Sequence, residues 1–428
     1  MATDIVIARE YTRGGPAEAG HYFMRVLLAP HGTRGDVQPM LALARGLRDR
    51  SHHVTFVLPD NFVEWVRSHR FEAMGDGVDV EHLLRTHGAK LDSARFQLRY
   101  FLDTLIPRQF DALSRAPDAD LIVGDGVQFA AASIAESRGV PYAAVGFCPC
   151  IVPSGDAPPP MVRTQTLPRW INRAIWTLGR PFTERLIAWL LRKHRRAIGL
   201  HHNDAPIENL MGERLIVAAD RDLAPMPEEA PERVSATDAW ILEENVEIDP
   251  TLEAFLAVDP PPVYVGFGSM VAAQAGELAA QAIAAIRSIG GRALVAGGWA
   301  DLDRFVPAAE DVLVARTVPH QAVLPRVAAV VHHGGAGTTT AAARAGRPQV
   351  VLPHILDQFY WGRRVAVLGI GPRALPVPIA TADILAERID TAVNDPRMRS
   401  RASALGAAMR NRNGVPRAVE ILESLTLT

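Results

Sequence analysis

This sequence has few cysteines and a small net charge. Its 428 residues hold two cysteines, and 45 Lys and Arg stand against 47 Asp and Glu, for a formal net charge of −2. This balance excludes a chain-wide electrostatic attraction to nucleic acid. Cys148 and Cys150 lie in FCPCI, too close together for an easy disulfide and without further metal ligands beside them. We interpret them as reduced, structural thiols of a cytoplasmic protein.

Long apolar runs are also missing. No stretch reaches the roughly 18 consecutive apolar residues of a membrane-spanning helix. Residues 1–23 have no basic start followed by an apolar core, so we predict an N-terminal extension rather than a secretory signal. The loop after the first apolar run, HGTRGDVQP, is neither the dinucleotide fingerprint G-x-G-x-x-G nor a P-loop with its lysine. The first loop must therefore serve another purpose.

Short apolar runs alternate with longer amphipathic stretches from Met24 onward, as in MRVLLAP followed by MLALARGLRDR. This alternation predicts parallel β-α-β units, whose buried strands are rich in Val, Ile and Leu. A proline- and acid-rich passage interrupts the rhythm at 225–262, so we predict two α/β domains. The predicted parts are an extension at 1–23, a first domain at 24–240, a linker at 241–262, a second domain at 263–405 and a C-terminal helix at 406–428.

One segment, at 168–200, departs from this pattern. It carries Trp170, Trp176 and other apolar residues at near-helical spacing, punctuated by arginines. Pro181 predicts a break into two helices. We favour a pair of surface helices that cover the first domain. The alternative is a basic amphipathic patch that contacts a membrane or a lipophilic substrate.

The stretch AVVHHGGAGTTTAAARAG, residues 329–346, predicts an anion-binding turn between a strand and a helix. Glycines let backbone N–H groups approach an anion closely, and a helix N-terminus favours negative charge. The turn therefore suits a diphosphate. The next strand delivers Asp357 and Gln358, whose side chains suit sugar hydroxyls. Taken alone, such an Asp-Gln pair is often only a helix cap.

These motifs, with VGFGSM at 265–270 and TVPH at 317–320, closely resemble the donor-binding signature of the family-one glycosyltransferases. The resemblance covers nearly everything from Met24 onward. It points to the branch of bacterial and fungal sterol glucosyltransferases and of glycopeptide and macrolide glycosyltransferases. It implies an α/β protein of the GT-B fold, in which two Rossmann-like parallel-sheet domains face each other across a cleft. It also implies that the C-terminal helix returns to the first domain.

The resemblance implies a UDP- or dTDP-hexose as co-substrate and no cofactor. Two departures from the family pattern leave the choice of nucleotide open: Thr317 stands where many relatives have a stacking Trp, and Ala341 where they have a Glu for the ribose. The donor residues that the resemblance implies are His333, Gly335, Ala336, Gly337, Thr338 and Ser269 for the diphosphate, Asp357 and Gln358 for the sugar, and Val318 and His320 beside the base.

The first loop then becomes the acceptor side. Where much of the family has a catalytic histidine, this chain has Asp36, which the resemblance makes the general base for an acceptor hydroxyl. His31 is a rival base, a partner of Asp36, or simply a satisfied polar residue at a strand end. Arg34 orients Asp36, binds acceptor or is only solvated. Asp125 matches the family's second Asp, but two carboxylates would repel, so its role stays open.

Metal is not expected, although DAD at 118–120 and DLD at 301–303 echo the D-x-D of metal-dependent glycosyltransferases. The first of these is typical of a polar entry to a strand. We expect an inverting transfer of a hexose, with glucose foremost, to a hydroxyl of a lipophilic acceptor such as a sterol, polyketide or macrolide. Trp170, Trp176 and Arg34 are the predicted acceptor contacts. The alternatives are a non-hydrolysing sugar-nucleotide epimerase and a catalytically silent helper protein. No nucleic-acid partner is expected, and peripheral membrane contact through 168–200 remains open.

Overall fold

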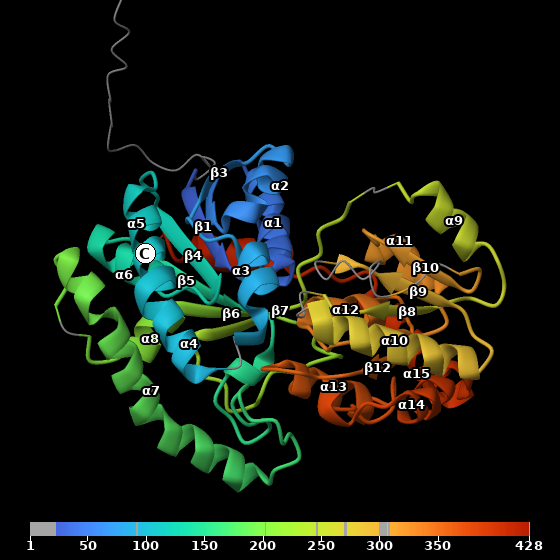
Figure 1. Cartoon of the computed structure of the whole chain (residues 1–428). Helices are drawn as coiled ribbons and strands as arrows, with labels where there is room; N and C mark the ends of the chain where they lie inside the picture. The colour runs from blue at the N-terminus through green and yellow to red at the C-terminus, as the bar shows by residue number, and fades with distance from the viewer. Residues whose placement is uncertain are drawn as a thin grey trace, which may run out of the picture.

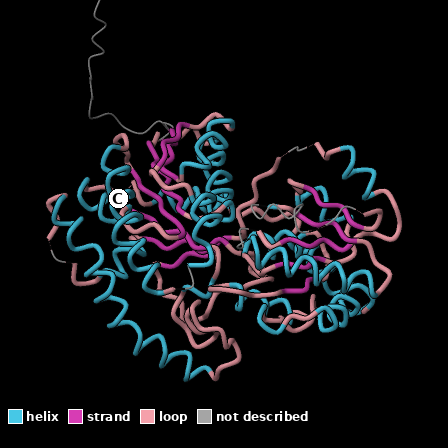
Figure 2. Tube along the Cα trace, in the orientation of Figure 1, coloured by secondary structure: helices cyan, strands magenta, loops and turns pink. Residues whose placement is uncertain are grey.

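Two parallel β-sheets organise the chain, each with helices packed on its faces (Figures 1 and 2). The first domain lies on the left of Figure 1 and the second on the right. This confirms the predicted α/β architecture of two Rossmann-like domains. The computed structural model describes residues 23–90, 93–201, 203–244, 247–268, 272–298, 306 and 309–427.

The first sheet has seven strands in the order β3-β2-β1-β4-β5-β6-β7, all parallel. Its central strands are buried on both faces, which is why they read as runs of Val, Ile, Leu and Ala. The strands are β1 (Arg25–His31), β2 (His53–Leu58), β3 (Glu72–Gly75), β4 (Leu121–Gly126), β5 (Tyr142–Gly146), β6 (Arg214–Ala218) and β7 (Val234–Thr237).

Eight helices connect these strands in the described part of the first domain. They are α1 (Arg34–Asp49), α2 (Val63–Ser68), α3 (Val80–His87), α4 (Ala94–Tyr100), α5 (Ile106–Arg115), α6 (Ala131–Arg138), α7 (Arg169–Ala197) and α8 (Pro206–Met211).

The second sheet has five parallel strands in the order β10-β9-β8-β11-β12. These are β8 (Val263–Gly266), β9 (Ala293–Ala296), β10 (Val312–Ala315), β11 (Val330–His332) and β12 (Gln349–Val351). The helices after β7 are α9 (Pro250–Leu256), α10 (Ala272–Ser288), α11 (His320–Val323), α12 (Ala336–Arg344), α13 (Gln358–Val367), α14 (Ala382–Asn394), α15 (Pro396–Met409) and α16 (Val415–Ser424). Helix α9 therefore lies inside the segment that was predicted as an extended linker.

The last helix, α16, packs against α1 of the first domain, and the C-terminal mark in Figure 1 lies in the same domain. Val415, Val419 and Leu422 of α16 are buried in the same apolar cluster as the side chains of α1. At the end of the helix, Glu423 accepts hydrogen bonds from Arg50 (2.7 Å) and His52 (2.9 Å). The first domain is thus completed by the end of the chain.

Polar contacts tie the second domain to loops of the first. Arg363 and Arg364 of α13 donate to the backbone carbonyls of Asp156 (3.0 Å) and Leu223 (2.9 Å). Arg344 of α12 lies 3.5 Å from the buried carboxylate of Asp220. These arginines all follow the predicted donor residues along α12 and α13, so they fix the donor side against the first domain.

The prediction that Pro181 divides the 168–200 segment is wrong, because α7 is one helix of 29 residues with Pro181 inside it. A proline in a helix costs about 3 kcal/mol through a lost hydrogen bond and a clash. Contacts on both sides of Pro181 offset this cost. Before the proline, the buried Asn172 donates to the carbonyl of Gly155 (2.9 Å); after it, the buried Leu190 and Leu191 anchor the C-terminal half.

No helix in the described ranges is long and apolar enough to cross a membrane. Both cysteines are buried free thiols. Asp120, in the first D-x-D echo, is paired with Arg25 at 2.7 Å, whereas 301–303 lies outside the described residues.

Candidate active site between the two domains

Asp36 is held at the start of α1, directly after the carboxyl end of β1. Thr33 is the N-cap, and the backbone N–H of Thr33 donates to Asp36 Oδ2 at 2.7 Å, which completes a capping box. Burial raises the pKa of Asp36 above its usual value, and the hydrogen bonds from Thr33 oppose this rise. A carboxylate with a raised pKa is a stronger base than a solvated one, so the position suits proton abstraction.

Asp125 lies beside Asp36, because β4 pairs with β1 and sets Asp125 opposite Pro30. Asp125 Oδ1 accepts the backbone N–H of His31 at 3.2 Å, while Oδ2 is buried without a partner among the described residues. Burial, and then the charge of Asp36, raise the pKa of Asp125 well above its usual value. The raised pKa favours the protonated form of Asp125, in which the predicted repulsion is absent.

His31 is buried at the end of β1 and forms a close pair with Asp76, with 2.5 Å between Nδ1 and Oδ2. Asp76 follows β3, and its other oxygen accepts the backbone N–H of Val78 at 2.9 Å. Sequence reasoning missed Asp76. A signal was present, since Asp76 and Asp125 both lie in a Gly-Asp-Gly triplet at a strand end.

His332, the first histidine of the predicted turn, is a structural residue. Its Nδ1 accepts the backbone N–H of Gly334 (3.1 Å), so its Nε2–H donates to Gln349 Oε1 (2.9 Å). Gln349 in turn donates to the carbonyl of Thr339 (3.3 Å). Burial lowers the pKa of His332 to about 3, which keeps the ring neutral. This network shapes the turn from β11 into α12.

His333 occupies a slot between two glycines. An added Cβ at Gly335 would lie 2.5 Å from Nε2 of His333, and one at Gly268 would lie 2.9 Å from its Cε1. Only glycine leaves room for the imidazole at these positions. Burial lowers the pKa of His333 to about 4, so the ring is neutral at pH 7.

Helix α12 starts next to this ring, with Gly335 as its N-cap and Ala336, Gly337 and Thr338 as its first turn. The first N–H groups of a helix have no acceptor within it and attract anions. The structure thus places together five of the residues predicted to bind the diphosphate. Ser269, the sixth, lies outside the described residues.

Asp357 and Gln358 stand at the start of α13. Asp357 accepts a hydrogen bond from Nε1 of the buried Trp361 (2.9 Å), and burial raises its pKa to about 6. Gln358 Oε1 accepts the backbone N–H groups of His354 (2.8 Å) and Ile355 (3.1 Å). The oxygen of Gln358 therefore holds its own loop, and its amide nitrogen is the group left for a ligand.

The two sides of the site face each other. The charge of Asp36 in the first domain contributes to the raised pKa of Asp357 in the second. Likewise, Arg34 and His333 both contribute, after burial, to lowering the pKa of His320 to about 4. Interactions between charges weaken with distance, so these couplings indicate that the acceptor-side carboxylate lies near the donor-side residues.

The remaining predicted residues have contacts of their own. His320 lies 2.9 Å from the hydroxyl of Tyr264, and Val318 is half-buried in the loop after β10. The guanidinium of Arg34 stacks 4.9 Å from the ring centre of Trp65. Trp176 donates to the carbonyl of Ala157 (3.0 Å), whereas Trp170 on the same helix is 69% exposed. The structure thus places these two tryptophans on α7 and leaves their acceptor contact a prediction.

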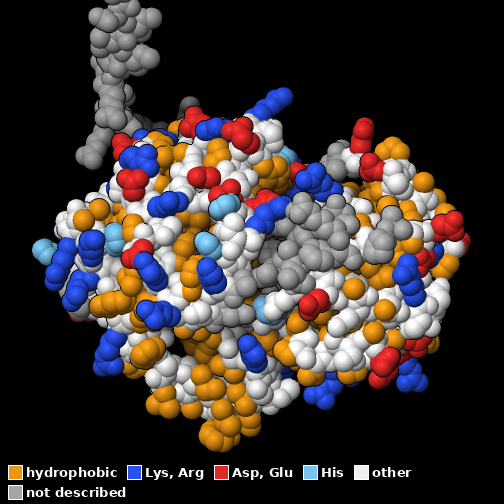
Figure 3. Space-filling view, in the orientation of Figure 1, with side chains coloured by type: hydrophobic (Ala, Val, Ile, Leu, Met, Phe, Trp, Pro, Cys, Tyr) orange, Lys and Arg blue, Asp and Glu red, His pale blue; other side chains and the backbone are white. Residues whose placement is uncertain are grey.

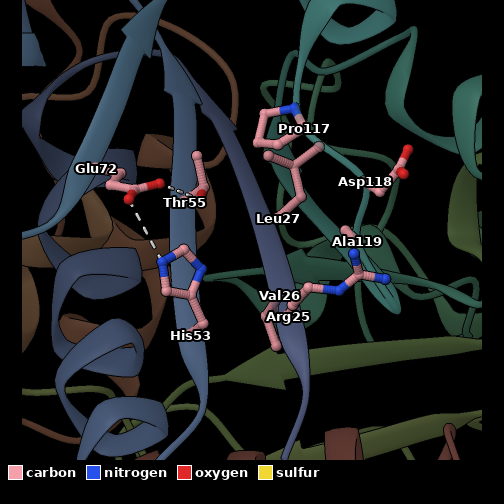
Figure 4. A pocket seen from close by; sticks show the side chains of 9 residues that line it. All are labelled: Arg25, Val26, Leu27, His53, Thr55, Glu72, Pro117, Asp118 and Ala119. Carbon is pink, nitrogen blue, oxygen red and sulfur yellow. Dashed lines mark hydrogen bonds and ion pairs between the residues drawn. The ribbon is translucent and has the colours of Figure 1, made fainter. Parts of the chain in front are cut away.

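A pocket of about 230 Å³ lies at the other end of the first sheet (Figure 4). It is lined by the first residues of β1 and β2 together with Glu72 and Asp118. Glu72 lies within hydrogen-bond distance of Thr55 (3.2 Å) and 3.5 Å from His53. Ligand sites of parallel sheets lie at the carboxyl ends of the strands, so this pocket is not the candidate site.

Solved structures with the same fold cover almost the whole chain. The glycosyltransferase of kitacinnamycin superposes with a TM-score of 0.70 at 21% identity, over 94% of this chain and 98% of that one. The glycosyltransferase VinC, solved in complex with dTDP, gives 0.67 at 21% identity, over 94% and 100%. These likenesses define the fold as GT-B, as the sequence resemblance implied.

Sequence comparison identifies the family of this chain more closely than the fold does. Residues 26–151 match the glycosyltransferase family 28 N-terminal domain, and 299–426 match the erythromycin biosynthesis protein CIII-like C-terminal domain. The vancomycin aglycone glucosyltransferase of Amycolatopsis orientalis is 37% identical over 94% of this chain and 98% of its own length. The dTDP-epi-vancosaminyltransferase of the same organism is 34% identical over 89% and 93%. The chain belongs to the same family of glycosyltransferases as these relatives. Neither the epimerase nor the silent helper protein finds support.

Proposed function

We propose that this enzyme transfers a hexose from a dTDP- or UDP-sugar to a hydroxyl of a lipophilic natural product or sterol, with inversion. The names of the relatives support this class of donor and acceptor, since they include a vancomycin aglycone glucosyltransferase, a dTDP-epi-vancosaminyltransferase and a sterol 3-beta-glucosyltransferase of Debaryomyces hansenii, 26% identical over 91% of this chain. The missing ribose-binding Glu, replaced by Ala341, is compatible with a donor that lacks the 2′-hydroxyl.

The observation that carries the proposal is the position of Asp36 at the start of α1 in the first domain, together with the anion-binding start of α12 and Asp357 in the second. In the proposed reaction, Asp36 takes the proton of the acceptor hydroxyl as its oxygen attacks the anomeric carbon. The bond from that carbon to the diphosphate breaks on the opposite face. The N-terminus of α12 stabilises the charge on the departing diphosphate, and Asp357 orients the sugar. A single displacement with one base inverts the anomeric carbon.

The test is Asp36→Asn, which keeps an oxygen for the capping box but cannot accept the proton. Loss of a general base costs roughly 10²–10⁴ in rate. We expect kcat to fall by that factor on a panel of glycopeptide, macrolide and sterol acceptors, with the Kd for dTDP and UDP unchanged by calorimetry. Full activity of Asp36→Asn would contradict the assignment. The buried His31, oriented by Asp76, would then be tested through His31→Phe. Binding of neither nucleotide to the wild-type protein would contradict the transferase itself.

A further inference from the structure

Helix α7 presents an apolar stripe to solvent. Its members recur at the spacing of one helix face, four or three residues apart. Their exposed fractions are far above those of Leu190 and Leu191, which are buried in the core of the first domain. The stripe comprises Leu178 (79%), Phe182 (71%), Leu186 (37%) and Trp189 (47%).

Exposed cations lie along the same outward face. They stand three, four or seven residues from members of the stripe, which is the same side of a helix. Within the described ranges these cations take part in no ion pair, whereas Arg180 pairs with Glu184 and Glu208, and Arg195 with Glu136. The unpaired set is Arg185, Arg192, Lys193 and Arg196.

We propose that this outward face of α7 docks on the surface of an anionic lipid bilayer. A helix with Trp, Phe and Leu beside free Lys and Arg has the composition of helices that lie in the membrane interface. From Leu178 to Arg196 the face is about 27 Å long. Figure 3 shows apolar side chains gathered at the lower end of the molecule and basic ones at its left edge, the two regions through which α7 runs in Figure 1.

The positive charge of this face of α7 favours an anionic bilayer over a second copy of the chain as its partner. Two copies joined through this face would bring two sets of unpaired cations together, and like charges repel. Anionic headgroups instead neutralise the cations, while the apolar stripe enters the boundary between headgroups and acyl chains.

The docked helix is linked directly to the donor side of the enzyme. Three consecutive residues bridge them: the carbonyls of Gly155 and Ala157 accept from Asn172 (2.9 Å) and Trp176 (3.0 Å) of α7, and that of Asp156 accepts from Arg363 (3.0 Å) of α13. Docking would therefore hold the site close to a lipid surface. Binding to lipid is measured without any transfer reaction, so the test stands apart from the proposed function.

The experiment is sedimentation of the full chain with phosphatidylcholine vesicles, with and without phosphatidylglycerol, at low and high salt. We expect partitioning only with the anionic lipid, weakened by salt. Arg192→Gln combined with Lys193→Gln should lower it about 25-fold, at about fivefold per charge. Phe182→Ser combined with Trp189→Ser should lower it at least tenfold. Matched controls are Arg399→Gln and Ile379→Ser, which alter exposed residues of the second domain.

Several results would overturn the docking. Equal partitioning to both kinds of vesicle, or none, excludes an anionic bilayer as the partner. Variants that bind as the wild type does would show that α7 is not the contact. A dimer seen by light scattering, and abolished by Phe182→Ser, would identify a second copy as the occupant. The altered side chains are exposed, so the variants are expected to fold as the wild type does. An unchanged circular dichroism spectrum then excludes misfolding as the cause of weaker binding.

Discussion

Replacing Asp125 with Asn should stabilise the protein by an amount that grows with pH. Asp125 is buried beside Asp36, and its Oδ2 has no partner among the described residues. Burial and the charge of Asp36 raise its pKa well above the ordinary value of 3.8. Asn keeps the shape and the acceptor oxygen for the His31 N–H, but it carries no charge at any pH.

The sign follows from proton linkage. Below pH 3.8 the folded and unfolded states both hold the proton, and the two proteins differ by a constant. Above it the unfolded chain releases the proton while the folded protein keeps it, so the wild type loses about 1.4 kcal/mol of unfolding free energy per pH unit. This loss continues until the pH passes the folded-state pKa. The variant has no such loss.

Thermal unfolding measures the effect. For a domain of about 200 residues, 1 kcal/mol corresponds to about 2–4 °C in Tm. The gap between Asp125→Asn and wild type should therefore widen by about 3–5 °C per pH unit between about pH 5 and the folded-state pKa. The control is Asp118→Asn, which removes a carboxylate from the surface of the same domain and so reports the loss of a charge without burial. A gap that is constant or shrinks with rising pH for Asp125→Asn would refute the reasoning.

Two further predictions concern the donor side. Asp357 has a pKa of about 6, and only its ionised form accepts hydrogen bonds on both oxygens, so the extra affinity for dTDP-glucose over dTDP should rise with pH through about 6. In Asp357→Asn that rise should disappear in calorimetric titrations; a rise that persists would assign it to another group. Gly335→Ala places a Cβ 2.5 Å from Nε2 of His333, so we expect the donor KM to rise at least tenfold while kcat changes less. An unchanged KM would show that His333 can leave its slot without cost.

The alternation of strands and helices was predictable because parallel strands buried on both faces must be apolar, as in Val26–Ala29 of β1. The β11–α12 turn was predictable because its glycines and histidines are adjacent in the chain. Asp76 was not, since its partner His31 lies 45 residues away and no local pattern joins them. The continuation of α7 through Pro181 was not predictable either. Propensity predicts a break at Pro181, and only the contacts on both sides of it decide otherwise.

The direction of the Gln358 side chain also lay beyond the sequence. Sequence reasoning gave its amide to the sugar, but Oε1 is taken by the N–H groups of His354 and Ile355. A side chain with both a donor and an acceptor is committed only when the surrounding loop has folded. The sequence predicts a sugar contact at Gln358, and the fold decides which atom of its side chain is left for it.

The position of α16 governs how the halves of this enzyme can be exchanged with those of its relatives. Val415, Val419 and Leu422 complete the core beneath α1, so a chimera cut only at the linker would join a foreign helix to the first domain. A working hybrid needs two junctions, and the last segment must travel with the acceptor half. On the ribosome, likewise, the core beneath α1 lacks the side chains of α16 until residues 415–424 have been synthesised.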